Sequence, residues 1–78
     1  MRRYRSKCPM YKRTFRKADQ THRFVITNTE GFGWEVREEQ DSRVISSVRY
    51  TDWHRVERAR MAFADQALNL QLSGWKES

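Results

Sequence analysis

The apolar residues of this chain change their spacing at Thr51, and the change predicts a sheet followed by a helix. Before Thr51 they alternate with polar residues, as in half-buried β-strands. After Thr51 they recur about every 3.6 residues, as on one face of an α-helix. The pattern predicts an α+β domain, a three-stranded antiparallel β-meander packed on one C-terminal α-helix.

The first two predicted strands cover residues 22–28 and 33–39. A three-residue hairpin loop that ends at Gly31 suits the connection between them, because glycine can adopt the left-handed conformation that closes such a loop. The loop length sets which residues face each other. The predicted cross-strand pairs are Ile26 with Trp34 and Phe24 with Val36.

The third predicted strand, residues 44–50, has to present its apolar positions on the same face as the first two strands. Val44, Val48 and Tyr50 reach that face only if the second loop has an odd number of residues. A two-residue loop would turn every side chain of the strand to the opposite face. The pattern therefore predicts a loop of odd length at residues 41–43.

The other face of the predicted sheet carries polar side chains of both charges. Its members are Glu35, Arg37, Glu39, Ile45, Ser47 and Arg49. Mixed charge is typical of a solvated sheet face, and the interleaved acids oppose the binding of a polyanion. The alternative is a binding face on which Arg37 and Arg49 contact phosphates.

The predicted helix begins at Thr51 or Asp52, because either side chain can accept a hydrogen bond from the first helical turn. It ends at Leu72 or Ser73, just before Gly74. One apolar stripe of the helix is expected to cover the sheet. Its members are Val56, Ala59, Phe63, Ala67 and Leu70, with Trp53 at the edge.

Three further apolar helix residues, here called the outer seam, lie away from that stripe: Met61, Leu68 and Leu72. One interpretation is a set of scattered surface residues; the other is a contact surface for a second copy or for the N-terminal segment. The chain has 78 residues and one cysteine, so its core is small and an internal disulfide is excluded. Self-association can supply the missing stability, which favours a homodimer.

Positive charge is concentrated at the N-terminal end. Residues 1–21 hold eight basic residues and one acid (+7), whereas residues 22–78 hold eight and nine (−1), giving +6 in all. We therefore expect a flexible basic arm over 1–21, a βββα domain over 22–73 and a short tail over 74–78. Basic side chains bind nucleic acid by releasing its counterions. The candidate contacts are Arg2, Arg3, Arg5, Lys7, Lys12, Arg13, Arg16 and Lys17.

The arm has two other interpretations. It can be a solvated tail without a specific partner, or it can contact an anionic membrane surface through Tyr4, Tyr11 and Phe15. The same aromatic residues could stack on exposed bases. Met10 is a second candidate start, and a chain that began there would lose four of the basic residues.

Little in the sequence indicates catalysis or a cofactor. Asp52 is explained as a helix cap and His54 as a solvated first-turn residue. Cys8, His22 and His54 lack the short paired spacings of a zinc site, and no apolar run approaches the ~18 residues of a membrane span. No helix follows Gly31-Phe32-Gly33, so this is a turn rather than a phosphate loop. We expect a cytoplasmic protein that is not an enzyme and has no metal, cofactor or small-molecule substrate.

The runs Gly-Trp-Glu-Val-Arg at 33–37 and Asp-Trp-His-Arg-Val-Glu-Arg at 52–58 resemble short bacterial proteins of unknown function. The resemblance covers about residues 23–70 and implies no activity. At the level of the fold, the predicted unit is similar to the arm-binding modules of tyrosine recombinases, which bind DNA with the exposed face of the sheet. Two expectations follow: a binding module associated with nucleic acid through its arm, or a protein-interaction domain with a functionally neutral tail.

Overall fold

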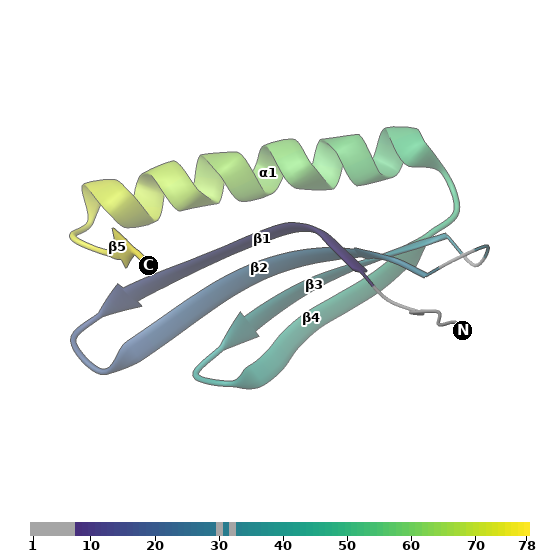
Figure 1. The fold of residues 1–78 in the computed structure, drawn as a ribbon. Helices are drawn as coiled ribbons and strands as arrows, with labels where there is room; N and C mark the ends of the chain where they lie inside the picture. The colour runs from purple at the N-terminus through teal and green to yellow at the C-terminus, as the bar shows by residue number, and fades with distance from the viewer. Residues whose placement is uncertain (1–7, 30, 32) are drawn as a thin grey trace.

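The computed structural model describes residues 8–29, 31 and 33–78, and it places one helix over one face of a single antiparallel sheet (Figure 1). The strands lie in the order β4-β3-β2-β1-β5. The elements are β1 (Cys8–Lys17), β2 (Gln20–Asn28), β3 (Trp34–Gln40), β4 (Arg43–Tyr50), α1 (Trp53–Leu72) and β5 (Lys76–Glu77).

The α+β class and the single C-terminal helix are confirmed, but the predicted number of strands is wrong because the sheet has five. The main addition is β1, which was expected to belong to the flexible arm. It pairs with β2 from Cys8 opposite Asn28 to Lys17 opposite Gln20. The sequence of β1 does not alternate between apolar and polar residues as a half-buried strand does. Arg13 lies on the same face of the strand as the buried Phe15.

The core lies between α1 and the sheet face that it covers. Phe15 packs edge-on against Phe24, with ring centroids 6.1 Å apart, and Phe24 lies 4.7 Å from Phe63 of the helix. The complete cluster is Phe15, Phe24, Ile26, Val36, Val56, Phe63 and Ala67. Burial of one large apolar side chain contributes about 1.5–3 kcal/mol. The predicted inner stripe of the helix is thus confirmed at its three buried positions.

The first predicted register is displaced by two residues. Asn28 lies opposite Trp34, and the hairpin closes where the Thr29 amide donates to the Gly33 carbonyl at 2.9 Å. A shift of two keeps every side chain on its expected face, so the core is unaffected. Gly33 has φ +94°, and a Cβ there would collide with the carbonyl oxygen of Tyr50. The close approach of these two backbone segments requires glycine at this position.

The second hairpin has a two-residue turn at Asp41–Ser42, not the odd-length loop that was predicted. Both residues have positive φ, 52° and 68°, as in the turns that match the twist of paired strands. A bulge in β4 then restores the parity that the short turn would reverse. Val48 therefore lies opposite Val36 as expected. The predicted place of Val44 on the apolar face is wrong, because the bulge puts it opposite Glu39 on the face away from α1.

Candidate nucleic-acid interface

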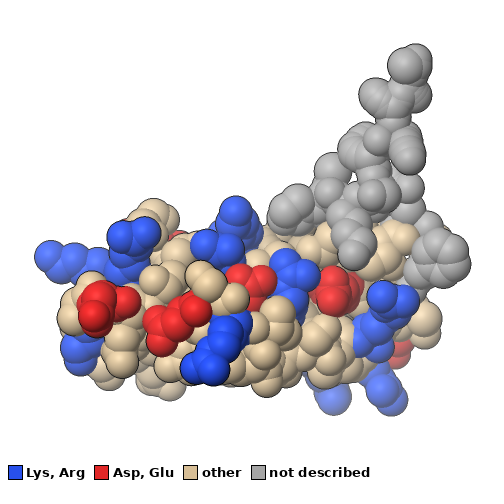
Figure 2. All heavy atoms as spheres, turned by 90° about the horizontal axis from the view of Figure 1, so that it is seen from below, with Lys and Arg blue, Asp and Glu red and all other residues tan. Residues whose placement is uncertain are grey.

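One face of the sheet carries no helix in the described part of the chain; we call it the open face. Figure 1 shows α1 on the other side, and Figure 2 looks onto the open face, where basic and acidic side chains are interleaved. The strand register places six basic and two acidic residues here, a net charge of +4. They are Lys12, Arg16, Arg23, Arg37, Arg49 and Lys76, with Glu35 and Glu39.

Both acids of the open face are engaged by neighbouring side chains. Glu39 accepts from Arg37 Nε at 2.8 Å and lies 3.4 Å from Arg23 Nη1. Glu35 accepts from Ser47 Oγ at 3.0 Å and lies 3.4 Å from Arg37 Nη1. Their side chains are only 18% and 15% exposed for Glu35 and Glu39, respectively. The acids that were expected to oppose a polyanion are therefore largely neutralised within the sheet.

The remaining basic residues of this face have no ion pair with any residue that the structure describes. Lys12, Arg16, Arg49 and Lys76 are all exposed, and Arg16 lies directly opposite Lys76 in the β1–β5 pairing. Like charges held side by side raise the local positive potential. These four side chains are free to bind an anion.

Aliphatic stems of the basic residues also explain one buried position on this face. Val25 is only 4% exposed although α1 lies on the opposite side. Lys12 and Arg37 flank it on the two neighbouring strands. Long basic side chains cover apolar surface with their methylene groups while their charged ends stay in water. The basic side chains of the open face therefore also cover the apolar Val25.

The eight residues expected to bind nucleic acid are not all on one surface. Arg2, Arg3, Arg5 and Lys7 lie outside the described residues. The other four belong to β1 and divide by parity: Lys12 and Arg16 lie on the open face, whereas Arg13 and Lys17 lie on the side of the helix.

Arg13 and Lys17 are occupied by the C-terminal segment. Arg13 donates twice to the Glu77 carboxylate, from Nη2 at 2.7 Å and from Nε at 2.9 Å. This contact lowers the pKa of Glu77 below its ordinary value and raises the pKa of Arg13. Lys17 Nζ donates to the Ser73 carbonyl at 2.8 Å. Both cations hold the chain end against β1.

The outer seam lies on the solvent side of α1. Met61, Leu68 and Leu72 are 64%, 55% and 77% exposed. These values agree with an apolar surface that the sheet does not use. Whether it mediates self-association stays a prediction.

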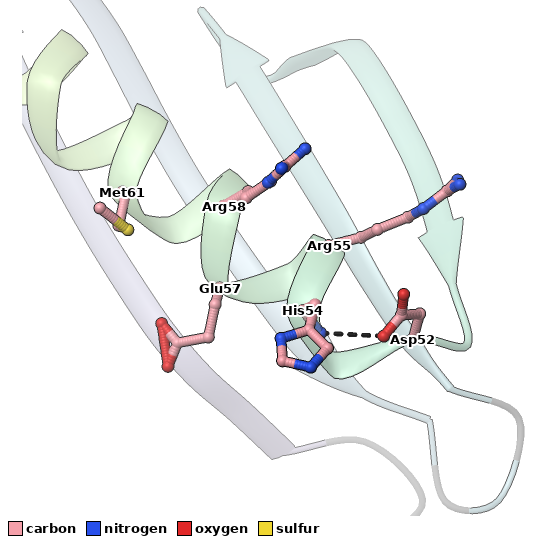
Figure 3. Close-up of a pocket in the computed structure, with 6 residues that line it drawn as sticks. All are labelled: Asp52, His54, Arg55, Glu57, Arg58 and Met61. Carbon is pink, nitrogen blue, oxygen red and sulfur yellow. Dashed lines mark hydrogen bonds between the residues drawn. The ribbon is translucent and has the colours of Figure 1, made fainter.

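The first turns of α1 carry charged side chains on two sides, as Figure 3 shows. Arg55 and Arg58 point to one side, and His54 and Glu57 point to the other. Asp52 caps the helix as predicted, because its Oδ1 accepts from the His54 amide at 3.0 Å. The cap accounts for Asp52 at the start of the Asp-Trp-His sequence.

The hydrogen bond between His22 and Glu38 was also not foreseen. His22 Nε2 lies 2.7 Å from Glu38 Oε2, and the imidazole packs on Phe24 with centroids 4.8 Å apart. The two residues are diagonal neighbours across the β2–β3 pairing, in which His22 lies opposite Gln40 and Glu38 opposite Phe24, so sequence spacing gave no signal. Within the described ranges, no group of three or more His, Cys, Asp or Glu side chains is placed to hold a metal ion.

Comparison with protein-family models, with curated proteins and with solved structures finds no match to this chain. The chain thus shows no likeness to a family of known function, as its sequence indicated. Among the described residues, no helix is long and apolar enough to cross a membrane.

Proposed function

We propose that this protein is a small non-enzymatic module that binds nucleic acid through the open face and the basic N-terminal residues. The observation that carries this proposal is the internal pairing of Glu35 and Glu39. It leaves Lys12, Arg16 and Arg49 without a carboxylate partner among the described residues and accessible to phosphates. Such cations release counterions from nucleic acid, which drives association.

The composition of the open face indicates what kind of contact it makes. Its described strand residues are basic, acidic, hydroxyl-bearing or aliphatic, and none is aromatic. Phosphate contacts position a ligand without reading its sequence. We therefore expect binding by the open face to tolerate sequence changes and to weaken steeply as salt rises.

A charge-matched pair of double variants tests this function. Lys12→Gln/Arg16→Gln removes two cations from the open face, and Arg43→Gln/Arg60→Gln removes two exposed cations elsewhere. Fluorescence anisotropy with a labelled 20-base-pair duplex at several salt concentrations gives the affinity and its salt dependence. The open-face variant should lower the log–log slope by about 1.8, because each lost phosphate contact removes about 0.9. The control should change it little.

Two results would refute the proposal. One is that the full-length chain binds neither duplex nor single-stranded nucleic acid at low salt. The other is that the two double variants weaken binding equally, which would trace the effect to net charge rather than to the open face.

The second candidate is a protein-interaction module that self-associates through the outer seam. The exposure of Met61, Leu68 and Leu72 favours it, since small monomers seldom expose aligned apolar residues without a partner. Sedimentation equilibrium of the parent should show a dimer that Leu68→Gln converts to a monomer. Ala62→Gln, at another exposed helix position outside the seam, should leave the dimer intact. A monomeric parent at high micromolar concentration would exclude this function.

A further inference from the structure

A row of basic side chains leaves the open face at the end of β4 and continues onto α1. Two clefts mark its path, of about 350 and 400 Å³. The first is lined by Arg49, Tyr50, Thr51, Asp52 and Arg55, and the second by Tyr50, Arg55, Arg58 and Ala59. Because the clefts share Tyr50 and Arg55, they form one continuous surface, which we call the corner.

The three cations of the corner outnumber its one acid, Asp52, which lines the first cleft and caps α1. Arg49, Arg55 and Arg58 are exposed and make no ion pair within the part of the chain that the structure describes. Arg55 and Arg58 are one helical turn apart and project to the same side (Figure 3). Like charges at this spacing destabilise a helix slightly. A bound anion would relieve that repulsion.

The corner also supplies the aromatic side chain that the open face lacks. Tyr50 is half-buried and lines both clefts. It lies opposite Trp34, whose ring centroid is 5.3 Å from that of Trp53. Aromatic side chains next to cations are typical of surfaces on which single-stranded bases stack. The open face offers phosphate contacts alone, whereas the corner offers phosphate contacts and a stacking position.

We infer that the ligand is a single-stranded nucleic acid that turns around the corner, with phosphates on Arg49, Arg55 and Arg58 and a base on Tyr50. This inference rests on the proposed function and specifies its ligand. The path passes from one side of the sheet to the other, across a molecule only 17 Å thick. Bending a duplex by about 40–90° within about 20–30 base pairs costs free energy, because duplex DNA is stiff over about 150 base pairs. A single strand follows the turn without that cost, so the corner favours a single strand.

The test compares two double variants on two probes of equal length. Arg55→Gln/Arg58→Gln changes the corner, and Lys12→Gln/Arg16→Gln changes the open face. The probes are a labelled 20-nucleotide oligothymidylate and a 20-base-pair duplex, each titrated at several salt concentrations. The corner variant should lose roughly tenfold in affinity for the single strand, with a salt slope lowered by about 1.4. Its affinity for the duplex should be unchanged.

A variant at Tyr50 separates stacking from charge. Tyr50→Leu should weaken single-strand binding several-fold without changing the salt slope, because no phosphate contact is lost. Tyr50→Phe keeps the ring and should bind the single strand as the parent does. Loss in both variants would point to the hydroxyl group and contradict stacking.

The outcomes distinguish this inference from the function on which it rests. If the open-face variant binds weakly while the corner variant binds the single strand as the parent does, the corner inference is wrong and the proposed function stands. An equal loss for duplex and single strand in the corner variant would also overturn the inference. If neither double variant differs from Arg43→Gln/Arg60→Gln on either probe, both proposals fall.

Discussion

Alternate residues of β1 differ in their partners although they belong to one basic run. Arg13 and Lys17 lie on the side of α1, where Glu77 and the Ser73 carbonyl hold them. Lys12 and Arg16 lie on the open face and have no acid partner in the described structure. Each pair consists of one lysine and one arginine, and the two pairs are neighbours in the sequence. Position on the pleat therefore decides which cations stabilise the fold and which are free to bind a ligand.

The largest expected change in stability comes from Phe15, the buried apolar residue on the helix side of β1. Phe15 is fully buried and packs on Phe24. Phe15→Ala should lower the free energy of unfolding by about 3–5 kcal/mol. This is close to the whole stability expected of such a small domain. Urea unfolding followed by circular dichroism measures the change.

The neighbouring residue provides the control. Thr14→Ala shortens a side chain on the open face of the same strand and should cost less than about 1 kcal/mol. If both variants unfold at the same urea concentration, β1 does not belong to the cooperative unit. A chain that starts at Thr21 lacks Phe15 and should not fold on its own.

The fold could be predicted from the sequence wherever one side of an element is uniformly apolar. The stripe of Val56, Phe63 and Ala67 met that condition, and the expected burial is found. β1 did not meet it, because Arg13 interrupts its inner row and is paired with Glu77, 64 residues away. Local periodicity carries no information about such a distant partner. The two-residue turn and the bulge of β4 escaped prediction because they compensate each other.

Only part of the candidate site could be predicted from the sequence. Arg37 and Arg49 were recognised as a possible phosphate-binding pair, and their placement on one face follows from strand alternation. The sequence could not show that Glu35 and Glu39 bind Arg37, because that depends on side-chain distances of 3.4 and 2.8 Å. Lys76 joins the open face only because β5 returns to β1.

A second prediction concerns the loop that fixes which residues share a face. Gly33→Ala should destabilise the protein by more than about 2 kcal/mol. Its positive φ alone costs about 1–2 kcal/mol for a residue with a Cβ, and the new methyl group would also collide with the Tyr50 carbonyl. Thermal unfolding measures the loss.

Gly31 is the matched position in the same loop. Its φ is +89°, but apart from the glycine and its two chain neighbours no atom lies within 4 Å of the place where a Cβ would stand. Gly31→Ala should therefore show only the conformational cost. Equal losses at the two positions would mean that the close approach to Tyr50 adds nothing to the conformational cost.

The smallest expected effect is the pH dependence of chain-end docking, which should require Arg13 and not Arg16. Because Arg13 lowers the pKa of Glu77, the ion pair stabilises the docked chain end above the ordinary value of 4.5. That contribution is lost as the pH falls through the lowered pKa of the folded state. The pair is partly exposed, so its loss should cost less than about 1 kcal/mol.

Amide exchange at Ser78 reports this docking, because the Ser78 amide donates to the Thr14 carbonyl at 2.9 Å. Protection of the amide, corrected for its intrinsic exchange rate, should fall below pH 4.5 in the parent. In Arg13→Gln it should be low at every pH, since the carboxylate has lost its donor. Arg16→Gln removes the same charge from the open face and should keep the protection and its pH dependence. If the two variants behave alike, net charge rather than position on the pleat holds the chain end, and the contrast between the two rows of β1 fails.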